Sequence, residues 1–154
     1  MEISGKTIAI TGASSGIGKS LALMLAKKGA KVALLDRRKE RLEQIKSEIE
    51  TFSPNVLAMP CDVRNRDNVD ACIAQIAGKF GSIDGIINNA GKGYFGTVAN
   101  MQANHIFELF EINILGPINL IQSVLPHLKK SKGIIVNISS SLRCWNLLTS
   151  AIVA

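Results

Sequence analysis

The 154-residue sequence has few aromatic residues and no metal-binding pattern of cysteines. Phe, Trp and Tyr together make up 5% of the chain, whereas 47% of its residues are hydrophobic, so we expect an aliphatic α/β core. Cys61, Cys72 and Cys144 form no Cys-x-x-Cys pair, which argues against a zinc site or a disulfide framework and suits a reducing cytoplasm. His105 and His127 have no neighbouring ligand pattern, so we expect no metal site.

The sequence also lacks an N-terminal signal core, and we expect no apolar run that approaches the length of a membrane span. We therefore expect a cytoplasmic chain with no membrane partner. The net charge is +6, but the basic residues are spread through helix-like segments beside acids, as in 37–41 and 46–48, and form no run interleaved with aromatic residues. Solvated helix faces explain this charge better than nucleic-acid binding does, although the charge favours anionic cofactors.

The segment 11–18 joins a strand pattern to a helix pattern through a turn with almost no side chains. Apolar residues 6–10 precede it, and helically spaced leucines follow it as far as Gly29. Glycines permit positive φ and a close approach to a ligand, and a helix N-terminus offers unpaired N–H groups, so the segment predicts a pyrophosphate site. The residues expected to contact a cofactor here are Gly12, Ser14, Ser15, Gly16, Ile17 and Gly18.

Two alternatives to a dinucleotide site exist at this turn. Its spacing, Gly-x3-Gly-x-Gly, misses the general Gly-x-Gly-x-x-Gly fingerprint, and an ordinary structural turn would need no ligand at all. Residues 13–20 also come within one residue of the Gly-x4-Gly-Lys-Ser loop that binds nucleoside triphosphates, with Ala13 in place of the first glycine. Loss of that glycine weakens a phosphotransfer function, which would require ATP and magnesium binding without preference for NAD.

Asp36 is the candidate ribose ligand. It ends the strand pattern at 31–35, about 20 residues beyond the glycines, where a carboxylate accepts hydrogen bonds from both hydroxyls of an adenosine ribose. A carboxylate there repels a 2′-phosphate and favours NAD, whereas the guanidinium of Arg37 suits the phosphate of NADP. We favour NAD and leave NADP possible, because Asp36 comes first and Ser15, not a basic residue, precedes Gly16. Asp36 is also suited to capping the following helix.

Strand and helix patterns alternate along the whole chain. Strands are predicted at 6–10, 31–35, 56–60, 83–87 and 133–140, a third helix at 66–80, and a long helix at 104–128 that Gly116-Pro117 is expected to kink. Right-handed crossovers then place the glycine turn at the switch point of a doubly wound parallel α/β sheet with strand order 3-2-1-4-5. The chain has the length of a single domain, and we expect one Rossmann-type dinucleotide-binding domain over residues 1–154.

Several motifs together resemble the short-chain dehydrogenase/reductase (SDR) family. The glycine turn has the Thr-Gly-x3-Gly-x-Gly spacing of its cofactor loop, Asp62-Val63 follows the third strand, and Asn-Asn-Ala-Gly follows the fourth. The resemblance implies that Asp62 accepts a hydrogen bond from the adenine amine beside Val63. It also implies that Asn89, Ala90 and Gly91 lie along the cofactor.

The same resemblance implies two catalytic candidates. Asn113, in the long helix, would maintain a proton-relay water, although an asparagine that satisfies a helix kink is an alternative. Ser140, at the end of the fifth strand, would bind the substrate carbonyl or hydroxyl and stabilise developing charge. The implied function is an NAD(P)-dependent oxidoreductase that transfers a hydride between nicotinamide and a small-molecule alcohol or carbonyl substrate.

The family's catalytic tyrosine, followed four residues later by lysine, is not found in the sequence. Tyr94 is followed four residues later by Val98, and no such pair follows Ser140. We therefore expect a cofactor-binding portion that is inactive alone, truncated after the fifth strand relative to the family. A non-catalytic dinucleotide-binding or interaction module is the alternative. An uncovered fifth strand would be an exposed edge, so we also expect self-association, as a homo-oligomer or otherwise.

Overall fold

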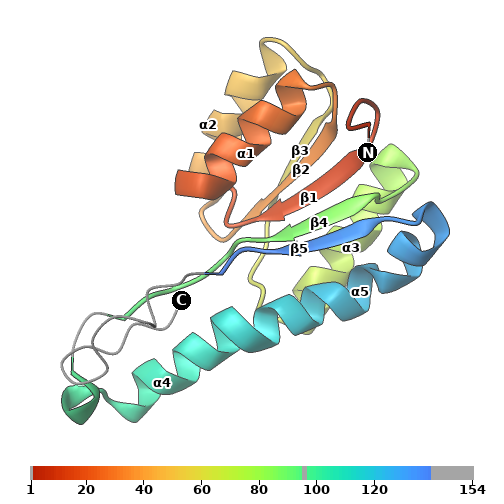
Figure 1. Cartoon of the computed structure of the whole chain (residues 1–154). Helices are drawn as coiled ribbons and strands as arrows, with labels where there is room; N and C mark the ends of the chain where they lie inside the picture. Colours follow the sequence, from red (N-terminus) through yellow and green to blue (C-terminus); the bar gives the residue numbers. More distant parts are fainter. Residues whose placement is uncertain (1, 95–96, 140–154) are drawn as a thin grey trace.

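Five parallel strands form a single sheet in the order β3-β2-β1-β4-β5, as predicted (Figure 1). The computed structural model of the chain describes residues 2–94 and 97–139. The strands are β1 (Thr7–Thr11), β2 (Lys31–Asp36), β3 (Val56–Pro60), β4 (Gly85–Asn88) and β5 (Ile134–Asn137). The helices are α1 (Gly16–Lys27), α2 (Lys39–Glu50), α3 (Arg66–Phe80), α4 (Ala103–Phe110) and α5 (Gly116–Ser131), with a 3₁₀ turn η1 (Val98–Asn100) and a π-helical segment η2 (Glu111–Leu115).

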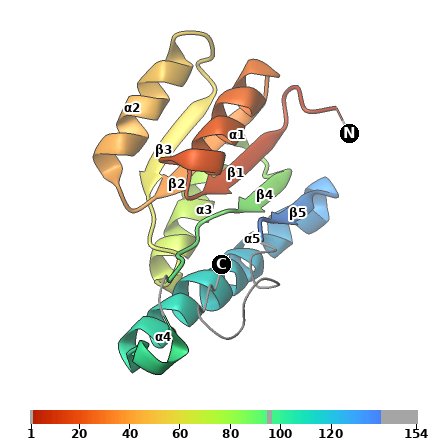
Figure 2. The same cartoon turned by 60° about the vertical axis from the view of Figure 1, so that its left-hand side comes forward.

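Helices cover both faces of the sheet, and the core therefore has two layers (Figures 1 and 2). Successive side chains of a strand point to opposite faces. In β1, Ile8 and Ile10 pack towards α1 and α2, whereas Ala9 packs towards α3 and α5. All five residues of β1 are buried, as expected for the central strand of a parallel sheet. This arrangement brings the carboxyl ends of β1, β2, β3 and β4 to one edge of the sheet.

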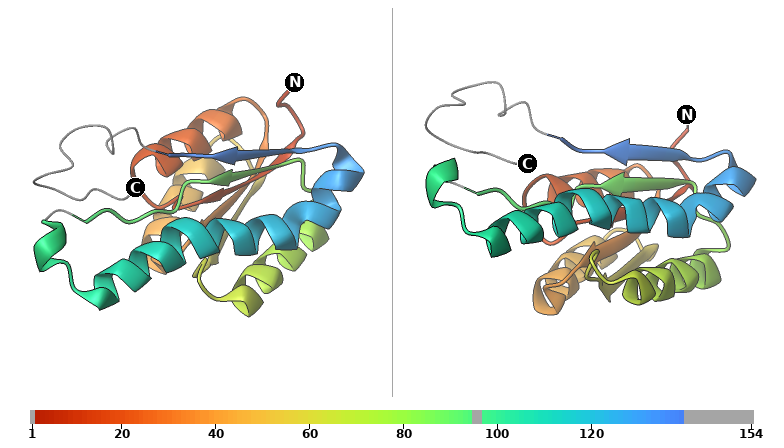
Figure 3. Two further views of the ribbon diagram at one scale, coloured as in Figure 1. Left: turned by 60° about the horizontal axis from the view of Figure 1, so that its bottom comes forward. Right: turned by 90° about the horizontal axis from the view of Figure 1, so that it is seen from below.

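The fifth strand is shorter than predicted. It was expected to reach residue 140, but it ends at Asn137 because its neighbour β4 ends at Asn88, whose carbonyl accepts one more hydrogen bond, from Ile138 N at 2.9 Å. Within the described residues, β5 pairs with β4 alone and its four residues are exposed. Figure 3 shows β5 at the outer edge of the sheet. The expected exposed edge is therefore present in this part of the chain, while self-association stays a prediction.

A π-helical segment interrupts the long helix just before Gly116-Pro117. Proline has no N–H, so the carbonyl of Asn113 cannot accept the usual α-helical bond from residue 117. The N–H of Gly116 donates instead to the carbonyl of Glu111, five residues back. Gly116 is also required sterically, since a Cβ there would lie 2.6 Å from Val63 Cγ2. The sequence thus predicts the position of the irregularity, but the structure has a wider, π-helical turn there in place of the predicted kink.

The helical run Ala103–Ser131 includes the long helix predicted at 104–128 and corrects one expectation about apolar segments. It contains 29 residues and is long and apolar enough to cross a membrane by length and composition alone, so the expectation that no segment approaches that length is wrong. A helix in the core of a folded domain passes the same test. Here 28% of the apolar window is buried: α5 packs against α3, β4 and β5, and the run buries Leu109, Ile112, Leu120, Val124 and Leu128.

Candidate functional site

Thr11 joins the glycine turn to the segment after β4. Its hydroxyl accepts hydrogen bonds from the N–H groups of Asn89 and Ala90, both at 3.0 Å, and donates to the carbonyl of Ile87 at 3.3 Å. In return, Asn89 Nδ2 donates to the carbonyls of Thr11 at 3.0 Å and Gly12 at 3.3 Å. Two motifs that lie far apart in the sequence therefore form one rigid rim at the carboxyl edge of the sheet.

The glycine turn leaves backbone groups and open space at the start of α1. Gly12 and Gly16 have φ of +63° and +53°, and a Cβ at Gly16 would meet nothing within 4 Å. A Cβ at Gly18, in contrast, would lie 2.3 Å from the carbonyl oxygen of Gly12. The first helical hydrogen bond runs from Lys19 N to the Ser15 carbonyl, so the three preceding amides lie ahead of the helical ladder. The turn is therefore suited to binding an anion.

A cavity of about 440 Å³ lies beside this turn. Nine of the thirteen predicted cofactor residues line this cavity. Of the other four, Ile17 lines a neighbouring cavity, and Ser14, Gly16 and Gly18 line neither. The side chain of Ser14 is buried and lies near the Asp36 carboxyl, whose pKa it helps to lower. The lining residues are Gly12, Ser15, Leu35, Asp36, Arg37, Arg38, Cys61, Asp62, Val63, Asn89, Ala90, Gly91, Lys92 and Ile112.

Asp36 is held by Arg38, a residue that the sequence analysis did not single out. Asp36 Oδ1 accepts from the backbone N–H of Arg38 at 2.9 Å and from its Nε at 3.1 Å, and Arg38 Nη2 also reaches Ser15 Oγ at 3.0 Å. Burial raises the pKa of the Asp36 carboxyl, but the hydrogen bonds from Arg38 outweigh this and keep the pKa below its ordinary value. The carboxylate is therefore charged at neutral pH and already has a cationic partner.

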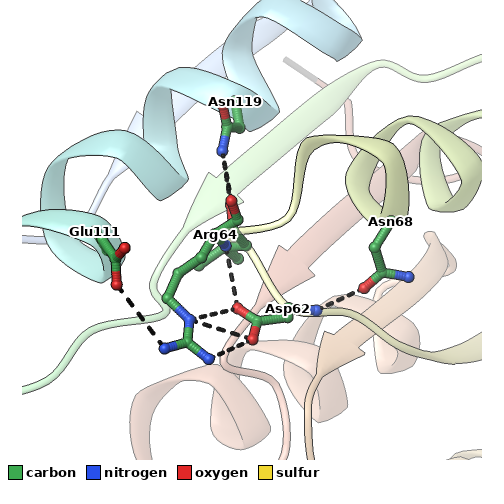
Figure 4. Close-up of polar contacts among 6 residues, drawn as sticks. Asp62, Arg64, Asn68, Glu111 and Asn119 are labelled. Atoms are coloured by element: carbon green, nitrogen blue, oxygen red, sulfur yellow. Dashed lines mark hydrogen bonds and ion pairs between the residues drawn. The ribbon is translucent and has the colours of Figure 1, made fainter. Parts of the chain in front are cut away.

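Asp62 is bound in the same way by Arg64 (Figure 4). Asp62 Oδ1 accepts from the backbone N–H of Arg64 at 3.1 Å and from Nε at 3.0 Å, and Oδ2 accepts from Nη2 at 2.6 Å. The hydrogen bond from Arg64 is the main reason that the pKa of Asp62 is lowered. The signal for both arginines is an Asp-x-Arg sequence at or just beyond the end of a strand, because an Asx turn brings the backbone and side chain of the second following residue back to the carboxylate.

A second cavity of about 790 Å³ continues from the first past the Asn89–Lys92 segment. Asn113 lines it, but both polar atoms of its side chain bind the backbone of Lys92: Oδ1 accepts from Lys92 N and Nδ2 donates to Lys92 O, both at 2.9 Å. The side chain therefore positions this segment, and Asn88 Nδ2 donates to Asn137 Oδ1 at 2.7 Å at the sheet edge nearby. The predicted catalytic residue Ser140 lies outside the described residues.

The loop after Gly91 contributes packing contacts. The ring of Tyr94 lies 5.4 Å from that of His105, centroid to centroid, consistent with a packing role for both. Lys92 Nζ forms an ion pair with Glu108 of α4. The loop is thus tied to α4 by its charged and aromatic side chains.

Comparisons with known proteins are consistent with these motifs. The family model for short chain dehydrogenases matches residues 6–144. The 11-beta-hydroxysteroid dehydrogenase-like 2 protein of Arabidopsis thaliana is 40% identical over 141 residues, which are 90% of this chain and 46% of that protein. A fatty acyl-CoA reductase of Acinetobacter baylyi is 38% identical over 141 residues, 90% of this chain and 48% of that protein. The chain thus spans about half the length of these curated relatives.

Solved structures of oxidoreductases are also similar to this chain. A 3-ketoacyl-(acyl-carrier-protein) reductase from Brucella melitensis, complexed with NADH, superposes with a TM-score of 0.85 at 31% identity over 90% of this chain and 58% of the other. An alcohol dehydrogenase from Thermococcus sibiricus, complexed with 5-hydroxy-NADP, superposes with a TM-score of 0.87 at 31% identity over 92% of this chain and 61% of the other.

Proposed function

This chain belongs to the short chain dehydrogenase family, and from that premise we propose that it is the cofactor-binding portion of an NAD(P)-dependent oxidoreductase acting on an alcohol or carbonyl substrate. One observation carries the proposal: the glycine turn, Asp36, Asp62 and the Asn89–Gly91 segment converge on one cavity of about 440 Å³. When bound, the nicotinamide cofactor supplies the chemistry of hydride transfer.

The described residues fit a dinucleotide. The amides at the start of α1, with open space above Gly16, would hold the pyrophosphate. Asp36 would bind the adenosine ribose and Asp62 the adenine amine, while the rim held by Thr11 would lie along the cofactor. Asn113 would act by fixing the backbone of Lys92, and its own carbonyl, deprived of an α-helical donor by Pro117, is the group suited to holding a water.

Arg38 supports NADP as a second cofactor beside NAD. Its guanidinium neutralises Asp36, the group that would repel a 2′-phosphate, and it already reaches Ser15 Oγ at the glycine turn. A ribose hydroxyl would share Asp36 with Arg38, whereas a 2′-phosphate would take Arg38 from Asp36. We therefore propose NAD as the preferred cofactor and Arg38 as the residue that admits NADP.

A non-catalytic dinucleotide-binding module is the second candidate, because the residues that converge on the cavity account for cofactor binding. Phosphotransfer has less support. Lys19, which would have to reach the phosphates, forms a 3.0 Å ion pair with Glu48 of α2. Ala13, in place of the wrapping glycine, is fully buried.

Calorimetric titration of the chain with NAD, NADP and Mg-ATP tests the proposal. We expect NAD to bind more tightly than NADP, and Mg-ATP to bind no better than AMP. Asp36→Asn should weaken NAD about tenfold, the loss of one charge-assisted hydrogen bond. Arg38→Gln should weaken NADP more than NAD, and Arg41→Gln, an exposed arginine one turn along α2, should change neither. Binding of Mg-ATP without binding of NAD would refute the proposal.

An activity assay separates the two candidate functions. We expect no oxidation of a broad panel of alcohols by the chain alone with NAD or NADP. Turnover in this assay would contradict the expected inactivity and support catalysis by residues present in these 154 positions.

A further inference from the structure

We infer that Arg64 is a positioning residue that couples occupancy of the adenine end of the cavity to the helical segment carrying Asn113. The inference rests on the proposed function, because it takes Asp62 as the group that meets the adenine amine. It assigns Arg64 a role that the sequence motifs do not, and it follows from three sets of contacts.

The first set places Arg64 between two acids on different elements (Figure 4). Its Nη2 lies 2.6 Å from Asp62 Oδ2, in the turn after β3, and its Nη1 lies 4.0 Å from Glu111 Oε2, the first residue of η2. Both Asp62 and Glu111 help to raise the pKa of Arg64, with the hydrogen bond to Asp62 as the largest cause. Arg64 thus has one tight partner and one looser partner, which it can approach more closely.

The second set ties the backbone of the same turn to the same helix. Asn119 Nδ2, from α5, donates to the carbonyls of Val63 at 3.0 Å and Arg64 at 3.4 Å. Val63 also packs where η2 gives way to α5, since a Cβ at Gly116 would lie 2.6 Å from Val63 Cγ2. The turn after β3 therefore cannot shift without moving the helix or breaking these contacts.

The third set connects that helix to the segment after β4. Asn113 of η2 binds both the N–H and the carbonyl of Lys92. Glu108, three residues before Glu111 and on the same side of the helix, forms an ion pair with Lys92 Nζ. Two ion pairs, Arg64–Glu111 and Lys92–Glu108, thus hold the helix to two cavity-lining segments.

These contacts define how the coupling works. An adenine amine that donates to Asp62 competes with Arg64 for the same carboxylate oxygens. Arg64 then interacts less with Asp62 and more with Glu111, which shortens the looser ion pair and stabilises η2, and with it the clamp between Asn113 and Lys92. Since the side chains of Arg64 and Glu111 are 33% and 50% exposed, the effect is modest, about two- to threefold.

The backbone amide of Lys92 reports on this clamp, because its N–H donates to Asn113 Oδ1. The probe is 5′-AMP, which carries the adenine but no nicotinamide. Amide hydrogen exchange of Lys92 is measured by NMR with and without saturating AMP, in the wild-type chain and in Arg64→Gln, Glu111→Gln and the double variant. Arg66→Gln is the matched control, because Arg66 lies two residues away and reaches Gln122 of α5 but contacts neither Asp62 nor Glu111 among the described residues.

We expect AMP to slow exchange of the Lys92 amide in the wild type and in Arg66→Gln. In Arg64→Gln and Glu111→Gln this protection should fall about two- to threefold, with no further fall in the double variant. Arg64→Lys should restore part of it. Equal protection in all variants would overturn the inference while leaving the proposed function intact. Failure of AMP to bind the wild type would overturn both.

Discussion

Thr7 and Thr11 permit a matched test of what holds the cofactor rim together. Both are buried in β1, four residues apart on the same face of the strand, with exposed fractions of 0% and 1%. The hydroxyl of Thr11 makes three hydrogen bonds, whereas that of Thr7 has no partner among the described residues. Replacing each threonine with valine exchanges a hydroxyl for a methyl group, at one position where the hydroxyl is hydrogen-bonded and at another where it is not.

The expected effects have opposite signs. Thr11→Val leaves the N–H groups of Asn89 and Ala90 without acceptors. Because the two residues are half-buried, each lost hydrogen bond costs about 1–2 kcal/mol, and the free energy of unfolding should fall by about 2–4 kcal/mol. Thr7→Val removes a buried hydroxyl that has no compensating hydrogen bond, so it should stabilise the chain by up to about 1 kcal/mol.

Urea unfolding of both variants, followed by circular dichroism, measures these differences. The midpoint should fall for Thr11→Val and stay equal or rise for Thr7→Val, with unchanged dependence on urea concentration. Calorimetry should also show weaker NAD binding by Thr11→Val, because the rim loosens. Equal shifts in the two variants would refute the claim that the hydroxyl of Thr11 holds the two motifs together.

Four further substitutions test other parts of the structure. Burial raises the pKa of Asp84, but hydrogen bonds from the Thr7 amide and from Lys6 outweigh it, so the folded pKa lies below 3.8. Asp84→Asn should therefore cost about 2 kcal/mol at pH 7, and in urea titrations the difference from wild type should shrink as the pH falls below 3.8. Gly18→Ala should lower the free energy of unfolding by more than about 2 kcal/mol, because the added Cβ meets backbone atoms. Gly78→Ala, in open space on α3, should raise the free energy of unfolding by about 0.5–1 kcal/mol, and with it the thermal midpoint. Asn65→Ala should lower helix stability by about 1 kcal/mol, because Asn65 accepts from Asn68 N at the start of α3; an unchanged midpoint would contradict that cap.

The sequence was sufficient for the fold because each element has a local signature. Alternating strand and helix patterns, with right-handed crossovers, allow few sheet orders, and the predicted order 3-2-1-4-5 is confirmed. The predicted bounds of the third helix, 66–80, also match, because Asn65 caps its start and Gly81, with a φ of +83°, ends it. The predicted end of the fifth strand, residue 140, is wrong, since the end of this strand depends on where the neighbouring strand β4 ends.

The site was harder to predict, because its contacts are set by turns and by neighbouring elements. The sequence predicts Asp36 and Arg37 at the ribose end, yet Arg38 is the residue that binds Asp36, since the turn after β2 brings back the second following residue. The bond between Asn113 and the backbone of Lys92 joins residues 21 positions apart and depends on the packing of the helix across the sheet edge.

The π-helical segment shows how one local constraint determines the geometry of this site. Pro117 removes an N–H donor, and Gly116 alone fits against Val63, so the helix widens over residues 111–115. That widening includes Asn113, whose side chain reaches Lys92, and starts at Glu111, near Arg64. In a regular α-helix, Glu111 would face another direction relative to α5, since one additional residue in a turn rotates the helix before it relative to the helix after it by about 100°. The irregular turn therefore orients the groups that connect both ends of the cavity to one helix.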